Sequence, residues 1–509
     1  MSVENNKRIV KNTIMLYIRM FLTMTVSLYT SRVVLSALGV EDFGIFNVVG
    51  GIVAMFSFLN NTLASGTQRF LTFQLGKKDY FELRKTFSTA LVIHIFIAVV
   101  ILFFAETAGL WFLNEKINIP ENRMHAARWV YQFSVFSSVI SIIQVPYNAS
   151  LIAHERMNIY AYVSILEVAL KLLIVYLLLL FSADKLILYS FMLFLLNVII
   201  ISIYRLYCKR KYEECSFQFV HDRALYRSML TFSGWNVFGS MGAVCTNQGI
   251  NILLNIFFGP VVNAARGISY QVSNAVMGFV TNFQTAVNPQ IVKLYADNKQ
   301  DDLFDLIFKN SKYAFLLLFL ISTPVFFELD LVLQWWLKTV PVNTSLFCRL
   351  ILIQCLIYSI VRPFVMTIHA IGKMKAVNLT AGTALLMVLP VSYFLLKNNF
   401  PSYSPFVVYI FGTLVEFSIE LFFLKTYINL SIRRLFFETV LPVLKVVVAS
   451  LVLPTIFFLC LKQGVGRFLI VSSAACISIV VFTYIFAFEA TEKKNVLIAI
   501  TRKLTKKRL

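Results

Sequence analysis

The chain has 509 residues, of which 59% are hydrophobic and only 14% are charged, and its formal net charge is +21. A soluble protein of this size averages about 25% charged residues, so the composition excludes a soluble globular protein and predicts a membrane protein. The sequence also lacks the alternating strands of about ten residues that build an outer-membrane barrel.

Apolar segments of about 20 residues, long enough to cross a bilayer as α-helices, follow one another along almost the whole chain. They predict an all-α polytopic membrane protein with about 14 transmembrane helices. An even number of spans places both termini on one side of the membrane. The predicted spans are residues 13–36, 43–65, 86–111, 128–152, 159–181, 186–204, 228–257, 263–290, 314–336, 347–370, 376–396, 404–424, 440–461 and 467–488.

The basic residues predict which side that is. With the N-terminus inside, 31 of the 46 Lys and Arg residues lie in inside segments, as expected for loops retained in the cytoplasm. Both termini are therefore predicted to be cytoplasmic. The net charge needs no nucleic-acid partner, because loops and a tail that meet anionic lipid account for it. The seven Cys are scattered and predict neither a disulfide nor a metal site.

The chain divides into two halves at its longest inside connection. The second spans of the halves read "GIFNVVGGIVAMFSFLNNTLASGTQRF" and "GISYQVSNAVMGFVTNFQTAVNPQIVK", which align without gaps, and Gly39 matches Gly259 if the second half has a turn longer by three residues. A parallel repeat of two six-helix lobes follows, related by an axis along the membrane normal. The predicted regions are an N-lobe at 1–207, a cytoplasmic linker at 208–227, a C-lobe at 228–426, and two additional helices with a basic tail at 427–509.

Polar side chains form stripes on the seventh and eighth spans, as the helical spacing of about 100° per residue shows. Such stripes cannot face lipid. They line either a water-filled cavity between the halves or an interface held by interhelical hydrogen bonds. The candidate substrate-binding residues on these stripes are Asn236, Asn247, Asn251, Arg266, Tyr270 and Gln284.

Arg19, Arg266 and Arg362 lie within spans and have no acidic residue at helical spacing. Arg19 and Arg362 are deep in their spans, whereas Arg266 lies near the outer end of the eighth. A cation in a cavity is available to an anionic ligand, so all three are substrate-binding candidates. The alternative for Arg266 is that it extends to the nearby membrane interface.

Two acids stand one turn apart in the twelfth span. Glu416 and Glu420 have no basic residue in their helix before Lys425. Two carboxylates in a low dielectric should not both stay ionised, so they are candidates for an ion-coupling site. The alternative is a buried pairing with Arg362 or another cation. Glu167 and Lys171, by contrast, are spaced to neutralise each other as a structural pair.

The stretch "LGVEDFGIFNVVGGIVAMFSFLNNTLASGTQRFLTFQLGK" resembles the second span and following loop of polysaccharide flippases of the O-antigen and capsule exporter type, in the multidrug/oligosaccharidyl-lipid/polysaccharide exporter superfamily. The likeness extends over the whole chain in span count and in the two extra C-terminal helices. It implies two lobes that rock around a cationic cavity in the bacterial cytoplasmic (inner) membrane. The implied substrate is a polyprenyl-diphosphate-linked oligosaccharide, and the implied partners are membrane lipids and the polymerase and export proteins of the same pathway.

The sequence is also compatible with other functions. An ion-coupled drug or small-molecule antiporter of the same superfamily would usually have twelve spans and acidic cavity residues. A membrane polysaccharide polymerase or glycosyltransferase would need a sizeable outer loop, which the sequence does not offer, and a channel or scaffold is a further alternative. No GxxxxGK[ST] phosphate-binding loop is present, so we expect a transporter that does not hydrolyse ATP. We also expect no cofactor and no enzymatic activity.

Overall fold

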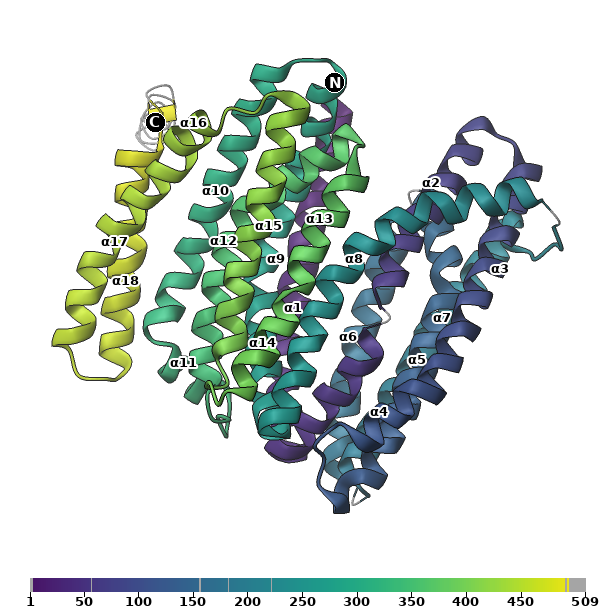
Figure 1. Cartoon of the computed structure of the whole chain (residues 1–509), viewed down its shortest axis with the longest axis horizontal. Coiled ribbons are helices and arrows are strands. Elements are labelled where there is room, and N and C mark those ends of the chain that lie inside the picture. Colours follow the sequence, from purple (N-terminus) through teal and green to yellow (C-terminus); the bar gives the residue numbers. More distant parts are fainter. Residues whose placement is uncertain are drawn as a thin grey trace, which may run out of the picture. The chain divides into compact units, whose positions relative to one another are not determined.

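The computed structural model describes residues 3–55, 57–154, 157–181, 183–220, 222–489 and 492–493. For some residues in these ranges only the backbone is described, and not the side chain. They are residues 3–20, 22, 57–63, 65, 76, 157, 158, 160, 161, 232–240, 282, 285, 286, 289 and 296. The described residues form helices and connecting loops without a strand, so the predicted all-α class is confirmed (Figure 1).

The helices follow one another along the chain with short connections (Figure 1). Their bounds are α1 Val3–Ala54, α2 Ser57–Lys77, α3 Tyr80–Phe104, η1 Ala105–Gly109, α4 Leu110–Glu115, α5 Glu121–Ala153, α6 Met157–Leu180, α7 Lys185–Lys211, η2 Glu213–Cys215, α8 Arg223–Phe258, α9 Pro260–Ala296, α10 Gln300–Phe327, α11 Leu329–Trp336, α12 Thr344–Ile371, α13 Met374–Leu386, α14 Val388–Lys397, α15 Ser404–Ile428, α16 Ile432–Leu435, η3 Phe436–Val440, α17 Leu441–Cys460, α18 Val465–Phe482 and η4 Thr483–Ala487.

Twelve helical segments among the described residues are long and apolar enough to cross a membrane. The chain is therefore a multi-pass membrane protein, since only segments that satisfy their own backbone hydrogen bonds can lie in lipid. Among the described residues, each of the fourteen predicted spans falls largely on helices. The twelve do not include α2 or α9, which carry polar side chains along their length and contain residues whose side chains are not described.

In each half, one glycine ends the first helix, and the two glycines have the same backbone conformation. Gly39 divides α1 with φ 81° and ψ 171°, and Gly259 ends α8 with φ 77° and ψ −176°. Only glycine adopts this region without strain, so both positions turn the chain where a side chain would resist it. In each half the same number of residues then leads to a second left-handed residue, Lys78 or Asn298. The junctions repeat as predicted, but the helix resumes directly after each glycine, so the longer second-half turn was wrong. Counted from the glycines, Gly267 is therefore equivalent to Asn47 and not to Gly44, with which the gap-free sequence alignment pairs it.

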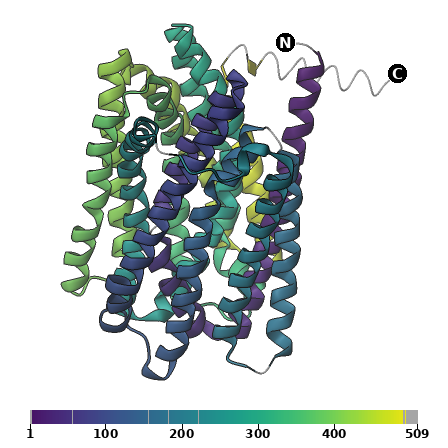
Figure 2. The same ribbon diagram turned by 90° about the vertical axis from the view of Figure 1, so that its right-hand side faces the viewer.

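The chain forms two compact units. Unit 1 comprises residues 1–271, 336–347 and 374–416. In it, α5 packs against α2, α3 and α7, and α8 packs against α2 and α13. Figure 2 shows the long helices of residues 80–211, drawn in blue, with their axes nearly parallel. Unit 2 comprises residues 272–335, 348–373 and 417–509, and there α17 and α18 pair with each other while α18 packs on α10 (Figure 1).

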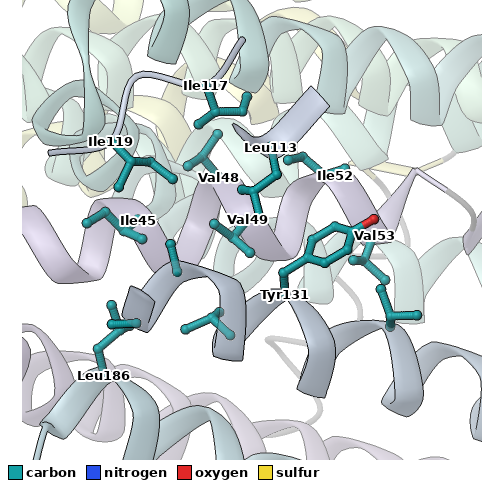
Figure 3. Close-up of a cluster of buried hydrophobic side chains, with 14 of the residues drawn as sticks. Ile45, Val48, Val49, Ile52, Val53, Leu113, Ile117, Ile119, Tyr131 and Leu186 are labelled. Carbon is teal, nitrogen blue, oxygen red and sulfur yellow. The ribbon is translucent and has the colours of Figure 1, made fainter. Parts of the chain in front are cut away.

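The core of unit 1 holds the second part of α1 in place. Val48 and Val49 are buried against Leu113 and Tyr131 (Figure 3). The Tyr131 hydroxyl donates a 2.7 Å hydrogen bond to the carbonyl of Ala105, which opens the π-helical turn of η1. That carbonyl also accepts the backbone N–H of Leu110, so the phenol adds a second hydrogen bond to it and ties α5 to the π-turn. The core thus fixes the helix that carries Asn47.

Candidate functional site

The junction at Gly259 brings the polar faces of α8 and α9 together in unit 1. Asn263 Nδ2 donates to the backbone carbonyl and side-chain oxygen of Asn251, at 2.7 and 2.8 Å. Asn255 Nδ2 donates to Asn263 Oδ1 at 3.0 Å and to the carbonyl of Asn118 at 3.3 Å. Asn251 Nδ2 also donates to the carbonyl of Asn47 at 3.1 Å. These buried amides join α1, α8, α9 and the loop before α5 in one network.

A close approach of two helices supports this network. A Cβ placed on Gly267 would meet the side chain of Asn47 at 2.7 Å, and one on Gly44 would collide with the backbone of Pro260. Counted from their junction glycines, Asn47 and Gly267 hold the same position in the two halves. The second helices of the repeat therefore touch each other at equivalent residues, and glycine makes that contact possible.

Arg266 lies one turn of α9 beyond Asn263, and it is 5% exposed. Its Nη2 donates to the carbonyl of Asn247 at 2.6 Å and to Asn247 Oδ1 at 3.0 Å, and its guanidinium stands 4.2 Å from the centre of the Tyr270 ring. Asn247 Nδ2 donates in turn to the Tyr270 hydroxyl at 2.8 Å. Arg266 Nε has no hydrogen-bond partner among the described residues. The guanidinium is thus buried among neutral groups.

Burial without a carboxylate makes this arginine unusual. None of the ion pairs formed by described residues includes Arg266. Removing a cation from water costs several kcal/mol unless an opposite charge or strong hydrogen bonds offset it. Two bonds to one asparagine and one aromatic face offset part of that cost. An anion that reached Nε would complete the coordination, so the arrangement suits an anionic ligand chemically.

Arg362 and Gln284 lie together in unit 2, on α12 and the second part of α9. Arg362 Nη1 donates to Thr281 Oγ1 at 2.9 Å. Gln284 Nε2 donates to the carbonyl of Ser359 at 2.8 Å, and its buried Oε1 has no hydrogen-bond partner among the described residues. These contacts are interhelical hydrogen bonds, which is one of the two roles predicted for the stripe.

The two acids of the predicted ion-coupling site lie on α15. Glu416 is half-buried, and Glu420, one turn further along α15, is 4% exposed. The side chains of Arg19 and Asn236, in α1 and α8, lie outside the described residues. The predicted pairing of Glu167 with Lys171 is confirmed by a 2.7 Å ion pair.

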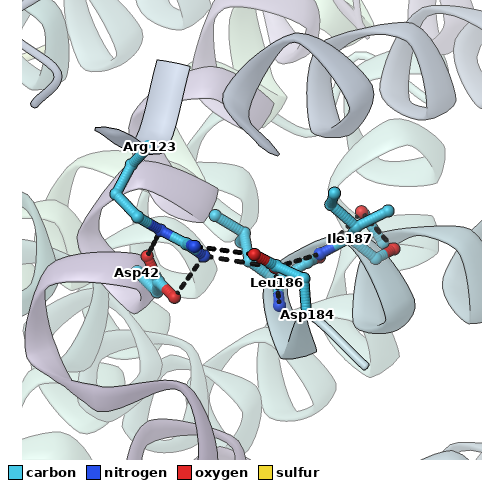
Figure 4. Close-up of polar contacts among 6 residues, drawn as sticks. Asp42, Arg123, Asp184, Leu186 and Ile187 are labelled. Carbon is cyan, nitrogen blue, oxygen red and sulfur yellow. Dashed lines mark hydrogen bonds and ion pairs between the residues drawn. The ribbon is translucent and has the colours of Figure 1, made fainter. Parts of the chain in front are cut away.

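A further polar cluster was not predicted. Arg123, at the start of α5, bonds Asp42 through Nε and Nη2 at 2.8 and 2.7 Å and Asp184 through Nη1 at 2.6 Å (Figure 4). Asp184 also accepts the backbone N–H groups of Leu186 and Ile187 and so caps α7. Partial burial raises the pKa of Asp184, but Arg123 and the capping bonds outweigh it and hold that pKa below its ordinary value. The acids were visible at predicted span ends, but their common partner is remote in sequence.

The family model for polysaccharide biosynthesis proteins matches residues 9–295. The chain belongs to this family. No curated protein sequence matches it. The fold of this family member is similar to that of lipid II flippase MurJ in an inward closed conformation, with a TM-score of 0.66 and 13% identity over 93% of this chain and 98% of that one.

Two further solved structures share the fold. One is an inward-facing multidrug resistance transporter of the MATE family in the MOP superfamily, with a TM-score of 0.64 and 13% identity over 81% of this chain and 98% of that one. The other is a MOP superfamily transporter from Pyrococcus furiosus, with a TM-score of 0.59 and 15% identity over 82% of this chain and 95% of that one. This polysaccharide biosynthesis protein therefore has the fold of MOP superfamily transporters.

Proposed function

We propose that the chain flips a polyprenyl-diphosphate-linked oligosaccharide, the repeat unit of an O-antigen or a capsule, from the cytoplasmic to the outer leaflet of a bacterial inner membrane. The observation that carries the proposal is Arg266, a guanidinium buried among neutral groups with one nitrogen unpartnered among the described residues. The family match and the flippase among the similar folds support the same substrate class.

The chemistry of such a substrate fits the residues. A diphosphate carries charge that lipid does not solvate, and arginine binds phosphate oxygens through a planar fork of donors. Sugar hydroxyls need donors and acceptors, which Asn247 and Tyr270 supply beside Arg266. The polyprenyl tail stays in the bilayer throughout. Arg19, Arg362, Asn236, Asn251 and Gln284 complete the proposed binding set.

The transport cycle that we propose is alternating access. The two lobes of the repeat, residues 1–207 and 228–426, would rock about the site while the linker at 208–227 joins them and the helices of 427–509 contact lipid. Both termini would be cytoplasmic. The energy would come from an ion gradient or from consumption of the product outside by polymerase and export proteins, without an enzymatic step in this chain.

Reconstitution tests the proposal directly. The purified protein is placed in vesicles with a fluorescent polyprenyl-diphosphate-linked oligosaccharide, and the fraction that becomes accessible to a sugar-oxidising or lectin probe in the opposite leaflet is measured over time. We expect flipping above that of protein-free vesicles and of vesicles that contain the Arg266→Ala variant. Equal rates in all three would refute a flippase activity.

A second candidate is an ion-coupled drug or small-molecule antiporter. The observation that favours it is the burial of Glu420 together with the half-buried Glu416, because acids suit a cationic substrate or a coupling ion. Uptake of cationic dyes in the same vesicles separates the two candidates. Gradient-driven dye transport that lipid-linked oligosaccharide does not inhibit would favour the antiporter.

A further inference from the structure

Unit 1 contains a cavity of about 380 Å³, which is lined by residues between Phe46 and Ile200 and not by Arg266. Four helices line it: α1, α5, α6 and α7. Ser137 of α5 and Asn197 of α7 each lie about 20 Å from the start of their helix, at a rise of 1.5 Å per residue. Because the apolar part of a bilayer is about 30 Å thick, the cavity lies well inside the membrane-spanning layer.

The cavity is polar for its depth. Ser134 and Ser190 each donate a hydrogen bond to a carbonyl of their own helix, at 2.8 and 2.9 Å, which leaves the lone pairs of both hydroxyls as acceptors. Asn197 Nδ2 donates to the carbonyl of Ser137 and to Ser141 Oγ. The ion pair of Glu167 and Lys171 also borders the cavity, with 38% and 45% of the side chains exposed.

These groups favour a neutral ligand rich in hydroxyls. Glu167 and Lys171 neutralise each other at 2.7 Å, so the cavity offers no net charge to an ion, while each retains hydrogen-bonding capacity. The Phe133 and Phe194 rings stack with centroids 5.9 Å apart and form an apolar wall. A sugar ring presents hydroxyls at its edge and C–H bonds on its face, and so matches both kinds of surface. An alkyl chain would leave the polar groups unpaired.

Comparison of the two halves shows how the space arises. Counted from the junction glycines Gly39 and Gly259, Phe46 is equivalent to Arg266 and Gly50 to Tyr270. In the second half the Tyr270 ring covers Arg266. In the first half Phe46 and Gly50 line the cavity, and a Cβ on Gly50 would meet no atom within 4 Å.

Gly50 is not needed for helix packing. A Cβ on the next residue, Gly51, would meet Asn251 at 2.6 Å and Gln248 at 2.9 Å, whereas Gly50 faces open space. A helical glycine costs about 1 kcal/mol relative to alanine. Open space beside a costly residue indicates that the space itself is used.

We propose that this cavity binds one sugar ring of the transported oligosaccharide, separately from the cation that binds the diphosphate. This inference rests on the proposed function. The volume lies at the small end of ligand pockets, which span about 300–1,000 Å³, so it holds a short saccharide segment and not the whole repeat unit. The sugar-binding and diphosphate-binding groups then belong to equivalent positions of the two halves.

The test uses the full-length protein in nanodiscs and free sugars without lipid or phosphate: glucose, galactose, N-acetylglucosamine and N-acetylgalactosamine. Saturation-transfer NMR measures contact of each sugar with the protein. We expect at least one sugar to bind. Gly50→Leu, which places a bulky side chain in the cavity, should lower the affinity at least ten-fold, and Gly50→Ala, which adds one methyl group, should retain binding. Arg128→Ala, on α5 but outside the cavity lining, should bind the free sugar like the wild type.

A double variant, Ser134→Ala with Ser190→Ala, guards against misfolding of Gly50→Leu. It removes two acceptors and fills no space, and it should also weaken the sugar signal. Absence of binding by the wild type, or unchanged binding in both Gly50→Leu and the double variant, would overturn the inference, as would a lipid tail bound in the cavity. Flipping without free-sugar binding would refute the cavity site alone, whereas sugar binding without flipping would refute the proposed function.

Discussion

Arg266 combines a positive charge with near-complete burial. If its role is to bind a diphosphate, Arg266→Lys should retain partial flipping because it keeps the charge and loses the fork, and Arg266→Ala should lower the rate by more than ten-fold. Arg32, which is only half-buried, should tolerate glutamine. Flipping is measured at equal protein content in vesicles. A wild-type rate for Arg266→Ala would mean that the residue does not contact the substrate.

The thermal stability of a further Arg266 variant separates a binding role from a structural one. A buried cation with no carboxylate partner destabilises the fold that contains it, so Arg266→Met should leave the unfolding temperature unchanged or raise it. A marked fall in that temperature would show that the guanidinium is held for packing and for its bonds to Asn247.

Arg123 has the opposite balance, since two carboxylates surround it. Arg123→Ala should lower the stability of unit 1 by roughly 2 kcal/mol, the typical value of hydrogen bonds to charged groups. The Asp184 pKa is depressed, so its contribution to stability is present at neutral pH and is lost as the pH falls below about 4. Thermal unfolding measured from pH 3 to 7 should therefore show a shallower acid loss in Arg123→Ala. Arg128→Ala, on the same helix but bonded to Asn114, provides the control.

At the level of helices, the junction glycines make a prediction that needs no substrate. Gly39→Ala and Gly259→Ala should each destabilise the protein by about 1–3 kcal/mol, because alanine is strained at these dihedral angles. Gly466→Ala is the matched control, since a Cβ there meets nothing within 4 Å and its φ is not left-handed. Chemical or thermal unfolding in detergent measures the stability of the three variants. Equal stability of all three variants would contradict the assigned junction geometry.

Helix α15 carries the acid pair. If Glu416 or Glu420 binds a coupling ion, replacing both by Gln should abolish the dependence of flipping on a proton or sodium gradient and leave the protein in the membrane. The measurement compares flipping rates with and without each gradient. Gradient dependence that survives the double replacement would assign both acids a structural role.

The helices could be predicted from the sequence because long apolar runs and the 3.6-residue period are local signals. The junction at Gly39 and Gly259 could also be predicted, since a glycine match needs no knowledge of packing. The asparagine network could be predicted only in part. Asn247 and Asn251 share a helical face, but the bond between Asn118 and Asn255 joins residues 137 positions apart. A contact of that kind depends on tertiary packing, which the spacing of residues along one helix does not encode.

Across the whole molecule, the repeat places different chemistry at equivalent positions. Arg266 and Tyr270 of the second half correspond to Phe46 and Gly50 of the first. A polyprenyl-diphosphate-linked sugar is itself asymmetric, with an anionic and a neutral part. Divergence of the two halves toward a cation and an open pocket fits such a substrate better than two identical sites would.

The topology of the whole chain depends on whether α9 crosses the membrane. Lys211 ends α7 and Asn343 precedes α12, and both are exposed. Three long helices, α8, α9 and α10, separate them, so they lie on opposite sides if all three cross. The 37 residues of α9 extend about 55 Å, which is long enough to cross a bilayer. Helix α9 is not among the twelve apolar spans, because it carries a polar stripe. In a variant without native cysteines, Lys211→Cys should react only from the cytoplasm and Asn343→Cys only from outside. Labelling of both from one side would mean that α9 does not cross, and the binding site that we propose at Arg266 would then need a different entrance.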